Sequence, residues 1–208
     1  MASIASPYGL RPAKKLGDTP MTHGQREIKL STNNSAAIFT GDIIVLSSAG
    51  NPSAATATPT TSTAGIVGVC VGVRYSLPQS MGGAVMFGQY LPANAITAGY
   101  TDVWVMVCDD PNTLFVVQGS AAFGTLTNGS HGAIGKNAAL GNFSAGNTAT
   151  GNSGVNLTVG TNGASLATTN TLAVRVVGVV PGTESDSFPE LLVKFNQGVH
   201  SYQAALGV

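Results

Sequence analysis

The feature that most constrains the fold is an alternating run of residues between Ile66 and Tyr75. Valines occupy positions 67, 69, 71 and 73, and the positions between them hold Gly68, Cys70, Gly72 and Arg74. A period of two is typical of a β-strand, so the valines are expected on one face and mostly small residues on the other. A face of small residues predicts the close approach of a second backbone or of a bulky side chain.

Helical periodicity is missing from the sequence. No window of about a dozen residues places apolar side chains at i, i+3, i+4 and i+7 without interrupting glycine, proline or β-branched residues. Further strands are expected at residues 26–30, 36–40, 42–46, 84–91, 102–108, 113–118, 172–180 and 191–195. Turn residues separate them, and the segment Asp109-Asp110-Pro111-Asn112 is expected to supply an Asx turn, with calcium ligation by its oxygens as the alternative. The sequence therefore predicts an all-β fold, a β-sandwich or β-barrel of short strands.

The chain is expected to divide into three parts. Residues 1–25 are predicted to form an extended arm, because their prolines and glycines prevent a long helix. Residues 26–196 form the β-rich core domain, with an exposed loop at 53–63 and a long Gly/Asn/Ser/Thr-rich excursion at 119–171. This excursion is expected to hold two or three short strands and to serve an interface. Residues 197–208 form a C-terminal tail.

Charge is scarce and unevenly distributed. Only 9% of the residues are charged, and nine Lys and Arg balance nine Asp and Glu. Residues 1–30 nevertheless hold five cations against two acids, so the predicted arm is positive and the remainder is mildly acidic. The chain as a whole lacks the basic footprint of a nucleic-acid partner, and no apolar run is long enough to predict a membrane span. We expect the positive arm to order on the surface of a protein partner.

Residue types that carry chemistry do not cluster in the sequence. His23, His131 and His200 are not at metal-ligand spacing from one another, and no catalytic motif is present. We therefore predict no enzyme activity, no catalytic residue, no metal site and no cofactor. Cys70 and Cys108 are predicted to be buried free thiols, with a cross-strand disulfide as the alternative.

The single tryptophan separates two functional hypotheses. Trp104 lies in the middle of an apolar strand-like run, where packing in the core is the expected role. If it were exposed, it could instead form a sugar-stacking platform together with tyrosines. A carbohydrate- or receptor-binding module of a phage tail or a cell surface is therefore the alternative function.

The N-terminal sequence resembles that of a family of virion structural proteins of tailed phages, many of them marine podoviruses and cyanophages. The matching residues there are Ser6-Pro7-Tyr8-Gly9-Leu10-Arg11-Pro12. Matching segments follow in order along the chain: Ile38-Phe39-Thr40-Gly41-Asp42, Gly68-Val69-Cys70-Val71-Gly72-Val73-Arg74-Tyr75, Asp109-Asp110-Pro111, Phe115-Val116-Val117-Gln118, Val176-Val177-Gly178-Val179 and Pro189-Glu190-Leu191-Leu192-Val193-Lys194-Phe195-Asn196.

This resemblance implies a capsid cement, or decoration, protein without enzymatic activity. Such a protein binds the outside of an icosahedral HK97-like head, bridges neighbouring major capsid proteins and stabilises the shell. The resemblance implies a place on the exterior of the virion after assembly in the host cytoplasm, and self-association around symmetry axes, with trimers as our expectation. The arm residues expected to contact the capsid are Pro7, Tyr8, Leu10, Arg11, Pro12, Lys14 and Lys15.

Overall fold

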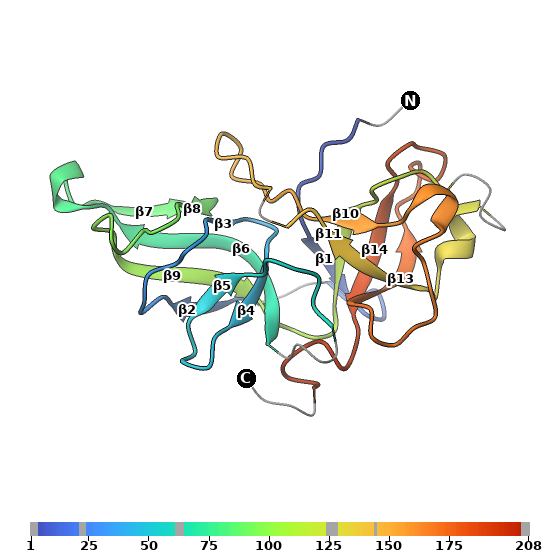
Figure 1. Cartoon of the computed structure of the whole chain (residues 1–208), viewed down its shortest axis with the longest axis horizontal. Coiled ribbons are helices and arrows are strands. Elements are labelled where there is room, and N and C mark those ends of the chain that lie inside the picture. Colours follow the sequence, from blue (N-terminus) through green and yellow to red (C-terminus); the bar gives the residue numbers. More distant parts are fainter. Residues whose placement is uncertain (1–3, 21–23, 61–64, 124–128, 144, 205–208) are drawn as a thin grey trace.

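The computed structural model describes residues 4–20, 24–60, 65–123, 129–143 and 145–204 (Figure 1). Strands and turns dominate, which confirms the all-β prediction. The strands are β1 (Arg11–Lys15), β2 (Arg26–Lys29), β3 (Ile38–Phe39), β4 (Ile43–Leu46), β5 (Pro52–Ala54), β6 (Ile66–Ser76), β7 (Val85–Gly88), β8 (Tyr90–Leu91), β9 (Thr101–Cys108), β10 (Thr113–Gln118), β11 (Asn137–Gly141), β12 (Asn156–Thr158), β13 (Val174–Val179) and β14 (Glu190–Phe195). Short 3-10 helices occur at η1 (Gln79–Met81), η2 (Gly129–Ala133) and η3 (Thr161–Gly163). Across the described ranges, no helix has the length and apolar character needed to span a membrane.

The strands form two large antiparallel sheets and one small ladder. The order in the first sheet is β1-β10-β14-β13-β11-β12. The second sheet has the order β2-β9-β6-β4-β5, and β7 also pairs with β6. The ladder joins β3 to β8. The two sheets lie at opposite ends of the elongated molecule, with β6, β7 and β9 reaching far to one side (Figure 1).

In the long strand β6, the structure differs from the sequence prediction in the faces that the valines occupy. Its partner register on β4 skips Val67, and its register on β9 skips Val71, so each valine is the extra residue of a bulge. A bulge resets the alternation of side chains. The prediction that all four valines share one face is therefore wrong: Val69 and Val71 pack into one core cluster, and Val67 and Val73 pack into the other.

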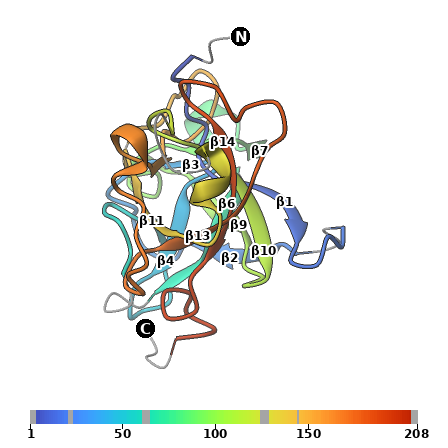
Figure 2. The same ribbon diagram turned by 90° about the vertical axis from the view of Figure 1, so that its right-hand side faces the viewer.

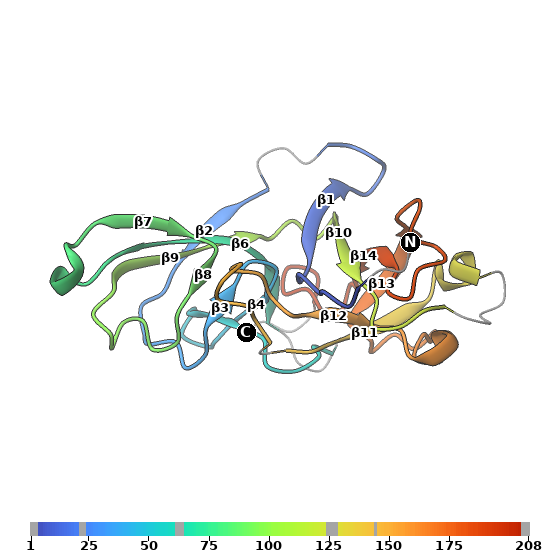
Figure 3. The same cartoon turned by 90° about the horizontal axis from the view of Figure 1, so that it is seen from above.

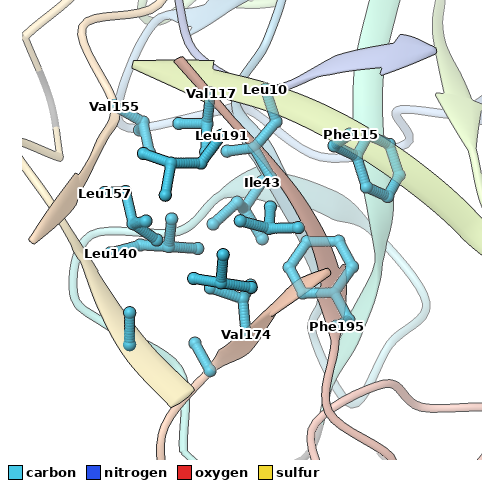
Figure 4. Close-up of a cluster of buried hydrophobic side chains, with 14 of the residues drawn as sticks. Leu10, Ile43, Phe115, Val117, Leu140, Val155, Leu157, Val174, Leu191 and Phe195 are labelled. Atoms are coloured by element: carbon cyan, nitrogen blue, oxygen red, sulfur yellow. The ribbon is translucent and has the colours of Figure 1, made fainter. Parts of the chain in front are cut away.

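Two hydrophobic clusters hold the sheets together. The larger one gathers side chains from both sheets, and Figure 4 shows Leu10, Ile43, Phe115, Leu191 and Phe195 converging on its centre. The smaller cluster lies within the second sheet and its connections; it includes Leu30, Ile38, Ile44, Leu91 and Val105. Strands β4 and β6 supply residues to both clusters, so neither cluster belongs to an independent segment of the chain.

The Gly-rich stretch 119–171 contributes to the core. Two or three short strands were predicted there, and two are present in the described residues, β11 and β12. Their inward residues Leu140 and Leu157 are fully buried in the larger cluster, as are Val155 and Val159 beside them. Strand β5 begins at Pro52 and includes the first residues of the predicted 53–63 loop, which is therefore shorter than expected.

Parts of both terminal segments, among their described residues, pack against the rest of the chain. Residues Arg11–Lys15 form the edge strand β1, which pairs with β10 and lies outside the rest of the first sheet (Figure 2). In the C-terminal part, Val199 and His200 are buried, and the backbone N–H of Ser201 donates to the carbonyl of Ile66 at 2.7 Å. Both segments fold back because they carry apolar side chains that lose their contact with water.

Candidate interaction surfaces

The N-terminal residues that were expected to contact a capsid contact this chain itself. Leu10 is 1% exposed and belongs to the larger core cluster. Its backbone N–H donates to the carbonyl of Gly41 at 3.0 Å. Gly9 and Gly41, both with positive φ, let the two backbones touch, since a Cβ on either would collide with the other segment. The expectation that Leu10 anchors a free arm is wrong, because its side chain is buried in its own core.

Tyr8 and Arg11 form a polar cluster at the start of β1. The Tyr8 hydroxyl donates to Oε1 of Glu190 at 2.8 Å, and the Arg11 guanidinium lies 4.7 Å from the Tyr8 ring centroid. Arg11 also donates to Oδ1 of Asn152 at 3.2 Å. Burial, assisted by the hydrogen bond to Glu190, raises the pKa of Tyr8, so the phenol stays protonated and keeps its role as donor. Pro7, Tyr8, Arg11 and Asn152 line a common open pocket.

The two lysines of β1 are also engaged within the chain. Lys14 pairs with Asp18 in the following turn, and Lys15 lies 2.8 Å from Oδ2 of Asp110. The Lys15 contact, with the backbone N–H of Asn112, holds the pKa of Asp110 below its usual range. That N–H donates to Oδ1 of Asp110 at 2.8 Å, which confirms the predicted Asx turn. Pro12 sits opposite Phe115 in the β1–β10 pairing. The structure therefore gives the predicted contact residues intramolecular roles.

A different surface, on the hairpin formed by β6 and β7, exposes large side chains to solvent. No charged residue occurs between Arg74 and Asp102, a feature visible in the sequence that our predictions did not use. The hairpin projects from one end of the molecule, with η1 at its tip (Figure 3). Large apolar side chains there face solvent: Met81 is 64% exposed, Val85 56%, Met86 42% and Phe87 70%. We call these four residues the apolar hairpin surface.

Cross-strand pairing extends the hairpin into a row of side chains on the outer face of the second sheet. Phe87 lies opposite Arg74, Arg74 opposite Trp104, and Trp104 opposite Lys29. Arg74 bridges two carboxylates, at 2.8 Å from Asp102 and 3.6 Å from Glu27. Outward-facing residues of neighbouring strands thus form one continuous surface from the hairpin to β2.

Trp104 is not in the core, contrary to the prediction. Strand alternation turns Val103 and Val105 inward and leaves Trp104 partly buried on the outer face. Its Nε1–H donates to Oδ1 of Asp102 at 2.8 Å. The Arg74 guanidinium and the Lys29 ammonium lie 5.4 and 5.7 Å from the ring centroid. Trp104 is therefore engaged within the chain by two cations over its ring and by Asp102 at its Nε1–H.

The cysteines behave as the sequence predicted. Both are buried and free, and they lie on neighbouring strands one register position apart. Cys70 packs into the smaller cluster and Cys108 into the larger one, so their side chains point away from each other. Burial raises the pKa of the Cys70 thiol to about 12, which keeps it protonated and unreactive.

His200 lies near the carboxylates of Asp109 and Asp110. Its ring is 1% exposed, and its Nδ1 accepts the backbone N–H of Tyr202 at 3.3 Å. Burial lowers the pKa of His200, although Asp109 and Asp110 oppose that shift. Ser201 follows it directly, but the Ser201 hydroxyl is buried without a hydrogen-bond partner. The group is inaccessible to a substrate, because His200 is 1% exposed and the Ser201 hydroxyl is buried.

The two adjacent aspartates after β9 are occupied by cations of the chain. Asp109 lies 3.0 Å from Nε of Arg26, and Asp110 binds Lys15. The described part of the chain holds no group of three or more His, Cys, Asp or Glu side chains placed to bind a metal ion. No family model matches the sequence, and no curated protein or solved structure matches the chain.

Proposed function

We propose that this chain is a non-enzymatic structural protein, a cement protein that binds the outside of an HK97-like phage head. In this role it bridges neighbouring major capsid proteins and stabilises the shell. The sequence resemblance supplies the class of partner. The apolar hairpin surface supplies the attachment site in place of the N-terminal arm.

The observation that carries the proposal is the exposure of Met81, Val85, Met86 and Phe87 on one projecting hairpin. A water-exposed apolar cluster is costly to keep and marks a binding site for another protein. Burying one such side chain fully stabilises a complex by about 1.5–3 kcal/mol, and these four are already partly buried, so each gains less. A partner that covers the hairpin would still gain several kcal/mol before the costs of association.

The backbone of the hairpin adds a second means of attachment. Strand β7 pairs only with β6, so its other edge presents unpaired N–H and C=O groups. Natural proteins usually protect such edges with lysine or proline, but Val85–Gly88 contains neither. An extended segment of a capsid protein could therefore add to this edge as a further strand, with side-chain contacts from Val85 and Phe87.

Shell stabilisation follows from many such contacts acting at once. A head carries many copies of its cement protein, and each copy that bridges two capsomers makes their separation depend on breaking an additional interface. Weak single interfaces become strong when several must open together. The low charge of the chain limits repulsion between crowded copies.

The proposal is tested on heads purified from a phage that encodes this chain and from the same phage with its gene deleted. We expect the chain in wild-type virions, with antibody labelling on the head. Added protein should bind the deleted heads and raise the temperature at which they release DNA. Labelling confined to the tail, or absence of the chain from virions, would contradict the proposal.

The attachment site is tested with a double substitution, Met86→Ser and Phe87→Ser. Both side chains are exposed, so the variant should fold normally while its affinity for the deleted heads falls on the order of tenfold or more. Ile134→Ser is the control, because Ile134 is 44% exposed and lies between η2 and β11, away from the hairpin. Equal binding of the double variant and the control would refute the hairpin as the attachment site.

A further inference from the structure

The outer face of the first sheet carries a trough beneath the turn that follows β1. One hollow of about 500 Å³ is lined by Leu16, Val177 and a polar group that includes Arg175, Lys194 and Asn196. A second hollow beside it shares Leu16 and Val177 and adds the apolar side chains of Leu114 and Leu192; it is also lined by Lys14 and Asp18, which pair with each other. The trough thus has a cationic end and a mainly apolar end whose one acid is neutralised, a combination suited to an acidic segment of polypeptide.

The cationic end places two like charges opposite each other. Arg175 on β13 is the direct cross-strand partner of Lys194 on β14. Like charges at such positions lie about 5 Å apart at Cβ and destabilise a sheet. Arg175 donates its Nε–H to Oδ1 of Asn137 at 2.9 Å, which leaves the outer nitrogens of the guanidinium available. Neither cation forms an ion pair with any acid of the described chain.

Two acids of the chain have the charge to bind this pair of cations and form no ion pair among the described residues. Seven of the nine acidic side chains are engaged within the chain: Asp18, Glu27, Asp102, Asp109 and Asp110 in ion pairs, Glu190 with Tyr8, and Asp42 with the N–H of Phe39. The remaining two, Glu184 and Asp186, lie on the loop that joins β13 to β14. Glu184 accepts the backbone N–H of Gly182 at 2.8 Å, and among the described residues neither acid forms an ion pair with a cation.

These acids and cations cannot meet within one molecule. Arg175 lies five residues before Val180, the last residue ahead of the loop, and an antiparallel strand rises about 3.4 Å per residue. The loop is therefore about 17 Å from Arg175 along the same rigid hairpin. The loop joins the ends of β13 and β14 that lie away from Arg175 and Lys194. A second copy can bring its loop to the trough without this constraint.

We propose that copies of this chain associate head to tail, with Glu184 and Asp186 of one copy bound to Arg175 and Lys194 of the next. The contact joins two different surfaces, so repeated association gives a ring if the rotation closes and an open chain if it does not. The apolar side chains of the trough add burial, since an exposed ion pair alone contributes about 0–1 kcal/mol. The contact does not depend on the proposed function, because it involves only copies of this chain.

The experiment is a charge exchange measured by analytical ultracentrifugation of the full chain at low salt. Arg175→Glu with Lys194→Glu reverses the trough, and Glu184→Lys with Asp186→Lys reverses the loop. We expect the wild-type chain to associate, each double variant alone to associate on the order of tenfold or more weakly, and raised salt to weaken the wild-type contact. An equimolar mixture of the two double variants should regain association, because each reversed surface then meets an opposite charge.

The matched control is Lys29→Glu with Lys136→Glu, which changes the net charge by the same amount as the trough variant. Neither lysine lines the trough, so this control should associate like the wild-type chain. Circular dichroism of every variant verifies folding, and rescue in the mixture cannot arise from unfolded chains. A wild-type chain that stays monomeric at low salt, or double variants that show no rescue on mixing, would overturn the inference.

Discussion

Two glycines of the same strand illustrate how much a single position depends on its tertiary neighbours. Gly68 and Gly72 both lie in β6, and both belong to the small face predicted from the alternating sequence. A Cβ at position 68 would collide with the backbone carbonyl of Cys108. A Cβ at position 72 would meet only the Met106 sulfur at 3.5 Å and the Gly88 carbonyl oxygen at 3.7 Å, which are ordinary contacts. The predicted close approach of a backbone thus occurs at Gly68 alone.

We therefore expect opposite results from the same substitution at these two positions. Gly68→Ala should lower the free energy of unfolding by about 1–3 kcal/mol or more, because the added methyl forces the β6 and β9 backbones apart. Gly72→Ala should leave it unchanged or raise it slightly, since alanine restricts the unfolded chain. Urea denaturation followed by circular dichroism measures both. Equal effects at the two positions would show that the approach of Cys108 is not the cause.

Among the secondary-structure elements, β1 changes the interpretation of the N-terminus most. It covers the edge of β10, and it carries Leu10 at its start into the larger core cluster. Its positive charges, which suggested a partner of opposite charge, are largely neutralised by Asp18 and Asp110. Because β1 covers a sheet edge and the residue before it fills the core, we expect this segment to be needed for stability. It is therefore poorly suited to leave the fold and bind a partner as an extended arm.

The test of this role is the stability of N-terminal variants. Leu10→Ala should lower the free energy of unfolding by about 2–5 kcal/mol, the cost of removing a fully buried leucine. The control Ile4→Ala should change it by less than about 0.5 kcal/mol, because Ile4 is 81% exposed. Deletion of residues 2–15 should lower stability more than Leu10→Ala, since it also opens the β10 edge. A deletion variant with wild-type stability would restore the hypothesis of a separate arm.

For the whole molecule, the sharing of strands between the two core clusters has a consequence for folding. Strand β6 contributes Val69 to the larger cluster and Val67, Cys70 and Val73 to the smaller one. It is also the strand with partners on β4, β7 and β9. If either cluster lost its packing, β6 would lose part of its buried contacts. We therefore expect the two large sheets to unfold together.

Cooperative unfolding can be measured with two probes on one sample. Trp104 is the single tryptophan, so its fluorescence reports on the second sheet alone, while far-ultraviolet circular dichroism reports on all strands. We expect the two urea transitions to coincide, as they do for a two-state protein. A fluorescence midpoint at a clearly lower urea concentration than the circular dichroism midpoint would show that the second sheet unfolds separately.

The sequence by itself determined the strands whose own residues specify them. Alternating apolar residues and turn residues predicted β9, β10 and β14 nearly to the residue, because local pattern and burial agree in these strands. The same reasoning predicted two buried free thiols and the Asx turn at Asp110. It could not predict the bulges at Val67 and Val71, since a bulge is defined by the register of a partner strand that local sequence does not contain.

The tertiary structure decided which surfaces are free. It buried Leu10, turned Trp104 outward, paired Lys15 with Asp110, and left the apolar hairpin surface exposed. It also separated Arg175 and Lys194 from Glu184 and Asp186, although all four lie within twenty residues of one another in the sequence. Exposure and charge pairing depend on distances between distant segments of the folded chain. These distances arise only when the sheets pack, which is why residue types alone could not show that the predicted contact residues have partners within the chain.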